Sequence, residues 1–112
     1  TQFLYGLASG QPGWVAVGMQ GTILTSADGA SWASQARGYH QTLVNIAFAG
    51  GTWMAVGAEG LILTSTNGLE WTQRPSGVTD LLRAVGHGNG RWIADLESGL
   101  ALAAVLLAGV RP

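Results

Sequence analysis

The stretch WVAVGMQGTILTSADGASW (14–32) is written a second time, 39 residues later, as WMAVGAEGLILTSTNGLEW (53–71). Of the 19 aligned positions 11 are identical, and the alignment needs no insertion or deletion. A third and weaker copy starts at Trp92. Self-similarity at a fixed period indicates a repeat architecture, in which each unit buries its apolar surface against its neighbours. We therefore interpret residues 1–112 as one domain with repeats at about 3–41, 42–80 and 81–112.

Each repeat favours short β-strands over helices. Runs such as LVNIAFA (43–49) and LILTS (61–65) are rich in β-branched and apolar residues, and Gly, Asn or Asp separates them. Glycines at equivalent positions, such as Gly18 and Gly57, would each cost a helix about 1 kcal/mol. Four strands within a period of about 40 residues are typical of a β-propeller blade. The predicted fold class is all-β, with about three incomplete four-stranded blades.

The third repeat departs from the other two. Asp95 stands where the first two repeats have Val17 and Val56, and the polar turn motif is replaced by AVLLAGV (104–110). Residues 100–108 are rich in Ala and Leu, so they fit either an extended strand or a short helix. Both alternatives stay open from the sequence.

Three blades are fewer than the roughly four to eight that close a propeller. A three-blade arc would leave two flanks with exposed apolar surface and unpaired strand edges. The sequence is only 10% charged, against about 25% in ordinary soluble domains, which favours a surface covered by another chain. Two arrangements follow: a homodimer that closes a six-bladed ring head to tail, or a piece of a longer propeller.

The segments TSADGASW (25–32) and TSTNGLEW (64–71) resemble the Asp-box, or BNR, repeat of β-propellers such as sialidases, sortilin-like receptors and photosystem II assembly factors. This sequence has one residue fewer between the acid and the tryptophan than the usual motif. The resemblance implies a hairpin between the third and fourth strands, away from the ligand face. It also implies backbone-bonding side chains and tryptophans buried between blades, which gives a structural set: Ser26, Asp28, Gly29, Trp32, Ser65, Asn67, Gly68 and Trp71.

Catalytic chemistry finds little support in the sequence. Sialidase-type hydrolysis would need several arginines, a Tyr–Glu pair and an acid, but the five arginines sit at unrelated phases of the repeat. Glu59 and Glu97 come nearest to the facing carboxylates that glycosidases use. The chain has no cysteine, and His40 and His87 have no acid at ligand spacing. We predict no catalytic residue, metal or cofactor.

A binding face is predicted where the loops between blades and the loops between second and third strands share one end of the ring. Aromatic and hydrogen-bonding groups there suit a carbohydrate or protein ligand. The candidate ligand-binding residues are Gln20, Tyr39, His40, Gln41, Glu59 and Asp80. The segment GHGNG (86–90) is interpreted as a turn with a polar tip.

The leading hypothesis is a non-catalytic binding or interaction module. The alternatives are a glycoside-acting, sialidase-like hydrolase completed across chains, and a structural or assembly factor. The net charge of −1, with no lysine and no basic cluster, predicts no nucleic-acid partner. No run approaches the roughly 18 apolar residues of a transmembrane helix, so no membrane partner is predicted either. The sequence assigns no compartment.

Overall fold

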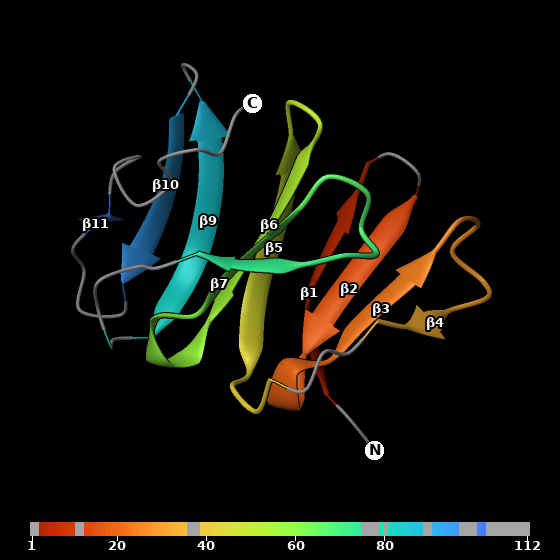
Figure 1. The fold of residues 1–112 in the computed structure, drawn as a ribbon, viewed down its shortest axis with the longest axis horizontal. Coiled ribbons are helices and arrows are strands. Elements are labelled where there is room, and N and C mark those ends of the chain that lie inside the picture. Colours follow the sequence, from red (N-terminus) through yellow and green to blue (C-terminus); the bar gives the residue numbers. More distant parts are fainter. Residues whose placement is uncertain are drawn as a thin grey trace.

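The computed structural model describes residues 3–10, 13–35, 39–74, 79, 81–88, 91–96 and 101–102. These residues form three antiparallel sheets that stand side by side, one for each repeat (Figure 1). We call them blades 1, 2 and 3. No helix in this part of the chain is long and apolar enough to cross a membrane.

Blades 1 and 2 each contain four strands in chain order, with one short 3-10 turn between the second and third strands. Blade 1 consists of β1 (Leu4–Ser9), β2 (Trp14–Gly18), η1 (Met19–Gly21), β3 (Ile23–Ser26) and β4 (Ala33–Ser34). Blade 2 consists of β5 (Leu43–Ala49), β6 (Thr52–Gly57), η2 (Ala58–Gly60), β7 (Ile62–Ser65) and β8 (Thr72–Arg74). The expected four-stranded units are therefore present twice.

The strand register repeats with the sequence period. Trp14 pairs with Ser26 across β2 and β3, and Trp53 pairs with Ser65 across β6 and β7. A bulge follows the first residue of β1 and of β5, because the register shifts after Leu4 and after Leu43 in the same way. The 39-residue spacing is thus a spacing of equivalent backbone positions.

Blade 3 is three-stranded within the described residues. It contains β9 (Leu82–Gly88), β10 (Arg91–Leu96) and β11 (Ala101–Leu102), in the order β11-β10-β9. Of the segment 100–108, residues Ala101 and Leu102 are strand, and the others lie outside the described residues.

The interpretation of residues 86–90 as a turn is wrong for residues 86–88, which belong to β9. His87 pairs with Trp92 across β9 and β10, and their rings meet edge to face at 4.7 Å. The pairing runs on to Gly88 and Arg91. This cross-strand ring contact and the strand pairing both favour an extended course for the glycine-rich segment.

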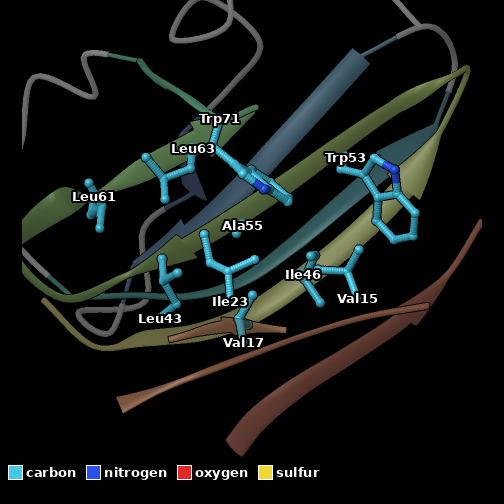
Figure 2. Close-up of a cluster of buried hydrophobic side chains, with 10 residues drawn as sticks. All are labelled: Val15, Val17, Ile23, Leu43, Ile46, Trp53, Ala55, Leu61, Leu63 and Trp71. Carbon is cyan, nitrogen blue, oxygen red and sulfur yellow. The ribbon is translucent and has the colours of Figure 1, made fainter. Parts of the chain in front are cut away.

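The apolar core lies between the blades. In the first interface Val15, Val17 and Ile23 of blade 1 pack with residues of blade 2 (Figure 2). The blade 2 members of this cluster are Leu43, Ile46, Trp53, Ala55, Leu61, Leu63 and Trp71. In the second interface Met54, Val56 and Ile62, on the opposite side of blade 2, pack with Leu82, Trp92 and Ala94 of blade 3.

Tryptophans at equivalent positions differ in burial. Trp53 and Trp71 of blade 2 are 0% and 8% exposed, as expected for side chains between blades. Trp14 and Trp32 of blade 1 are 39% and 40% exposed, so the prediction that the Asp-box tryptophan lies buried between blades is wrong for Trp32, and Trp14 does not take the core position that its place in the repeat favours. The physical reason is that no described sheet packs on their side of blade 1.

Candidate functional site

Two equivalent turns, η1 and η2, carry an exposed polar residue in an unusual backbone conformation. Gln20 has φ 55° and ψ 40°, and Glu59 has φ 58° and ψ 31°. They are the two non-glycine residues with positive φ among those described. The left-handed region costs a residue with a Cβ roughly 1–2 kcal/mol. Both blades have a residue with this strained backbone conformation at the same position of the repeat.

The loop that leads into blade 2 lies against η1. Gly21 is required there, because a Cβ at this position would collide with the carbonyl oxygen of Tyr39. The backbone N–H of Gln20 donates to the Thr42 hydroxyl at 3.4 Å. The loop that carries Tyr39 therefore lies beside the turn that carries Gln20.

The same loop also reaches η2. His40 Nε2 lies 3.8 Å from Glu59 Oε1, and the two side chains are 82% and 63% exposed. Gln41 is half-buried in the loop between them and β5. Asp80, the sixth predicted ligand-binding residue, lies outside the described residues. We call Gln20, Tyr39, His40, Gln41 and Glu59 the loop-end cluster.

The loop-end cluster offers polar, exposed groups on two blades. A bridging imidazole and carboxylate can donate and accept hydrogen bonds, and a neighbouring phenol ring can provide an aromatic face. No group of three metal-binding side chains exists among the residues that the structure describes. Glu97, the possible carboxylate partner of Glu59, lies outside them.

The Asp-box turns lie at the opposite ends of β3 and β7 from η1 and η2, since each turn follows the strand that η1 or η2 precedes. Asp28 Oδ1 accepts from the backbone N–H groups of Ala30 (2.8 Å) and Ser31 (3.0 Å). Asn67 Oδ1 accepts from Leu69 (2.8 Å) and Glu70 (3.0 Å) in the same way. An amide and a carboxylate therefore organise the two turns identically.

The serine of each box completes the turn. Ser26 Oγ accepts from Gly29 N at 2.8 Å and donates to Asp28 Oδ1 at 3.1 Å. Ser65 Oγ makes the same two bonds, at 2.8 and 3.1 Å, with Gly68 and Asn67. The donors around Asp28, chiefly the N–H groups of Ser31 and Ala30 and then the Ser26 hydroxyl, lower the pKa of its carboxyl below the ordinary value of 3.8.

The tryptophan of each box closes the turn through its indole. Trp32 Nε1 donates to the carbonyl oxygen of Gly29 at 3.2 Å, and Trp71 Nε1 donates to that of Gly68 at 3.0 Å. Gly29 and Gly68 have φ of +81° and +77°, which favours glycine at both positions. Every side chain of the Asp-box set thus serves the turn itself.

A groove that the sequence did not point to lies between the Asp-box turns of blades 1 and 2. Its volume is about 360 Å³, and Val15, Trp53 and Leu69 contribute to its lining. Leu69 is 44% exposed. The period of the repeat could not reveal this groove, because the groove depends on how blades 1 and 2 lie against each other.

Sheets that stack face to face and carry Asp-box turns between their third and fourth strands define blades of an Asp-box β-propeller. Among solved structures the chain is similar to YCF48 from Cyanidioschyzon merolae, with a TM-score of 0.76 and 19% sequence identity over 92% of this chain. This likeness confirms the fold that the Asp-box resemblance implied. The match covers 37% of the YCF48 chain. No protein-family model matches the sequence, and the search of curated proteins finds no match.

Proposed function

We propose that this protein is a non-catalytic interaction module that binds a protein or carbohydrate ligand through the loop-end cluster. The observation that carries the proposal is the left-handed backbone of Gln20 and Glu59. Glycine would occupy these positions without strain, so the side chains themselves account for the departure. Strained, exposed residues that recur on one end of a scaffold are typical of ligand contacts.

Three further features support binding at this end of the blades. His40 and Glu59 are more than half exposed and lie close enough to act on one ligand group. Tyr39, in the same loop, is half-buried and packs against the core between blades 1 and 2, which fixes the position of the loop. The sequence resembles the Asp-box family, which includes photosystem II assembly factors. YCF48, to which the structure is similar, is one of these assembly factors. A role as an assembly factor, with a protein as the ligand, is therefore the form of the proposal that the structural likeness favours.

The test compares the wild-type chain with a double variant, Gln20→Gly with Glu59→Gly, on a glycan array and a proteome microarray. Glycine relieves the positive φ, so the free energy of unfolding should rise or stay within about 1 kcal/mol. Ligands of the cluster should then bind at least about tenfold more weakly, which corresponds to the loss of one or two hydrogen bonds.

The matched control is Glu70→Ala, which removes an exposed acid from the Asp-box turn at the opposite end of blade 2 and should leave binding unchanged. Ligands that bind the double variant as well as the wild type would contradict the proposal. Turnover of a glycoside substrate that Glu59→Gln abolishes would replace it with the hydrolase alternative.

A further inference from the structure

Large apolar side chains are exposed together on one side of blade 1, which we call its outer face. This face is formed by β1 together with the tryptophans of β2 and of the Asp-box turn. Its exposed side chains and their exposed fractions are Leu4 50%, Tyr5 55%, Leu7 60%, Trp14 39% and Trp32 40%. Leu4, Leu7 and Trp32 line a shallow groove of about 380 Å³ on this face. A monomeric protein rarely leaves so many large apolar side chains together in water.

The same face exists a second time, in blade 2, where it is buried. Leu43 and Ile46 are the equivalents of Leu4 and Leu7, and they are 0% and 5% exposed. Trp53 and Trp71 are the equivalents of Trp14 and Trp32, and they are 0% and 8% exposed. The residue types are nearly identical, so the difference in exposure comes from the neighbouring blade that covers blade 2.

The internal interfaces show which surface covers such a face. Blade 1 covers blade 2 with Val15, Val17 and Ile23. Blade 2 covers blade 3 with the residues at the equivalent positions, Met54, Val56 and Ile62. The next equivalents along the chain are Ile93, Asp95 and Ala101, in β10 and β11 of blade 3.

Blade 3 holds these covering positions at the flank opposite to the outer face of blade 1 (Figure 1). Ile93 is 45% exposed there, whereas its equivalents Val15 and Met54 are 2% and 0% exposed. Within the described residues, the chain therefore carries an exposed apolar face at one end and, at the other, a flank on which the covering residue Ile93 is exposed.

We propose that the outer face of blade 1 binds the β10–β11 flank of a second copy of this chain, head to tail, with the geometry of the two internal interfaces. Two copies related by a two-fold axis form two such interfaces at once and make a ring of six blades. This proposal does not depend on the loop-end cluster. Both internal interfaces join one side of a blade to the opposite side of its neighbour. A pairing of two blade 1 outer faces would join like sides and is therefore disfavoured.

The covering positions of blade 3 depart from the pattern twice: Ala101 is smaller than Ile23 and Ile62, and Asp95 is charged where its equivalents are Val17 and Val56. A carboxylate at this position must be desolvated when the interface forms, which weakens association. The proposal therefore predicts that Asp95→Val tightens the pairing. We expect a dissociation constant at least about tenfold lower, as for the removal of a desolvation cost of 1.4 kcal/mol or more.

The test measures the mass of the 112-residue chain by sedimentation equilibrium at several concentrations. The wild type should reach the mass of a dimer, and Leu7→Asp and Ile93→Asp should each raise the dissociation constant at least about a hundredfold. An equimolar mixture of the two variants should regain part of the affinity, because the intact flank of one can cover the intact face of the other. Leu69→Asp is the control, since it places the same charge on an exposed leucine away from the outer face.

Tryptophan fluorescence gives a second readout that does not require a variant to fold. Association should bury Trp14 and Trp32 and shift the emission to shorter wavelength as concentration rises. A wild-type chain that stays monomeric, with constant emission, would overturn the proposal, and another protein or another blade would then be the occupant of the face. Dimers abolished by Leu7→Asp but unaffected by Ile93→Asp would overturn the head-to-tail arrangement in favour of face-to-face pairing.

Discussion

Leu4 and Leu43 occupy the same position of two consecutive blades, yet Leu4 is 50% exposed and Leu43 is completely buried. Their strands have the same register and the same bulge. What differs is the neighbour, because blade 1 covers Leu43 whereas no described sheet covers Leu4. The comparison shows that the repeat determines each blade internally, and that stacking determines how much each apolar side chain contributes to stability.

The largest effect that this comparison predicts comes from a charge on the covered side of blade 1. Val17→Asp places a carboxylate at a position that is 0% exposed, between blades 1 and 2. An unpaired buried charge should cost more than about 4 kcal/mol and unfold a small domain at room temperature. Circular dichroism and urea titration measure this loss.

Leu7→Asp is the matched substitution on the opposite side of the same sheet. Leu7 is 60% exposed, so the new carboxylate stays hydrated. At low micromolar concentration this variant should keep its fold and lose less than about 1 kcal/mol. If Val17→Asp and Leu7→Asp lowered the free energy of unfolding equally, blades 1 and 2 would not be stacked through the face that carries Val17.

A smaller effect compares the serines of the two Asp boxes. Ser65→Ala and Ser26→Ala each remove one acceptor of backbone N–H groups and one donor, as the alanine variant of a helix cap does. We expect losses of about 1–2 kcal/mol for Ser65→Ala and about 0.5–1 kcal/mol for Ser26→Ala. The difference arises because Gly68, whose N–H loses its partner, is buried, whereas Gly29 is exposed. Denaturant unfolding of both variants checks the order, and a reversed order would contradict this reading of the two turns.

The smallest effect is a pH dependence of stability that the Asp-box turn of blade 1 should show and that of blade 2 should not. The folded-state pKa of Asp28 is lowered, so its stabilising contribution is complete above the unfolded-state value near 3.8. The contribution is lost as pH falls through the lower pKa of the folded state. Asp28→Asn, which copies Asn67, should therefore lose less thermal stability than the wild type when pH drops from about 5 to about 2.

The control for the titration is Asn67→Asp, which should introduce the same acid sensitivity into blade 2. Melting temperatures of the three proteins at several pH values test both statements. A wild type and Asp28→Asn with parallel pH profiles would show that this carboxyl contributes nothing to the acid dependence.

The fold was predictable to the extent that it is local and repeated. The 39-residue period and the D-G and N-G pairs placed the strands of blades 1 and 2, because glycine punctuation and β-branched runs act within a few residues. The Asp-box resemblance alone predicted burial of its tryptophan, whereas the count of three blades predicted exposed apolar flanks; the exposure of Trp14 and Trp32 follows the second prediction, because it depends on what covers blade 1 and not on the residues of blade 1. The extended course of His87 was missed because the glycines around it suggested a turn, while its stacking partner Trp92 lies across the hairpin.

The candidate site was predictable only in part. Loop order along the chain was enough to group Gln20, Tyr39 and His40 at one end of the blades. The close approach of His40 to Glu59 depends on tertiary contacts, and the positive φ of Gln20 and Glu59, although it recurs with the repeat, cannot be recognised from residue types that rarely adopt it. The ligand of these residues remains the subject of the proposal.

Copied blades are stabilised by burying equivalent faces against like neighbours. The sharpest test compares Leu4→Ala with Leu43→Ala, with free energies of unfolding measured by urea titration at a protein concentration low enough to keep the chain monomeric. We expect a loss of about 2–5 kcal/mol for Leu43→Ala and less than about 1 kcal/mol for Leu4→Ala. Equal losses at the two positions would contradict it.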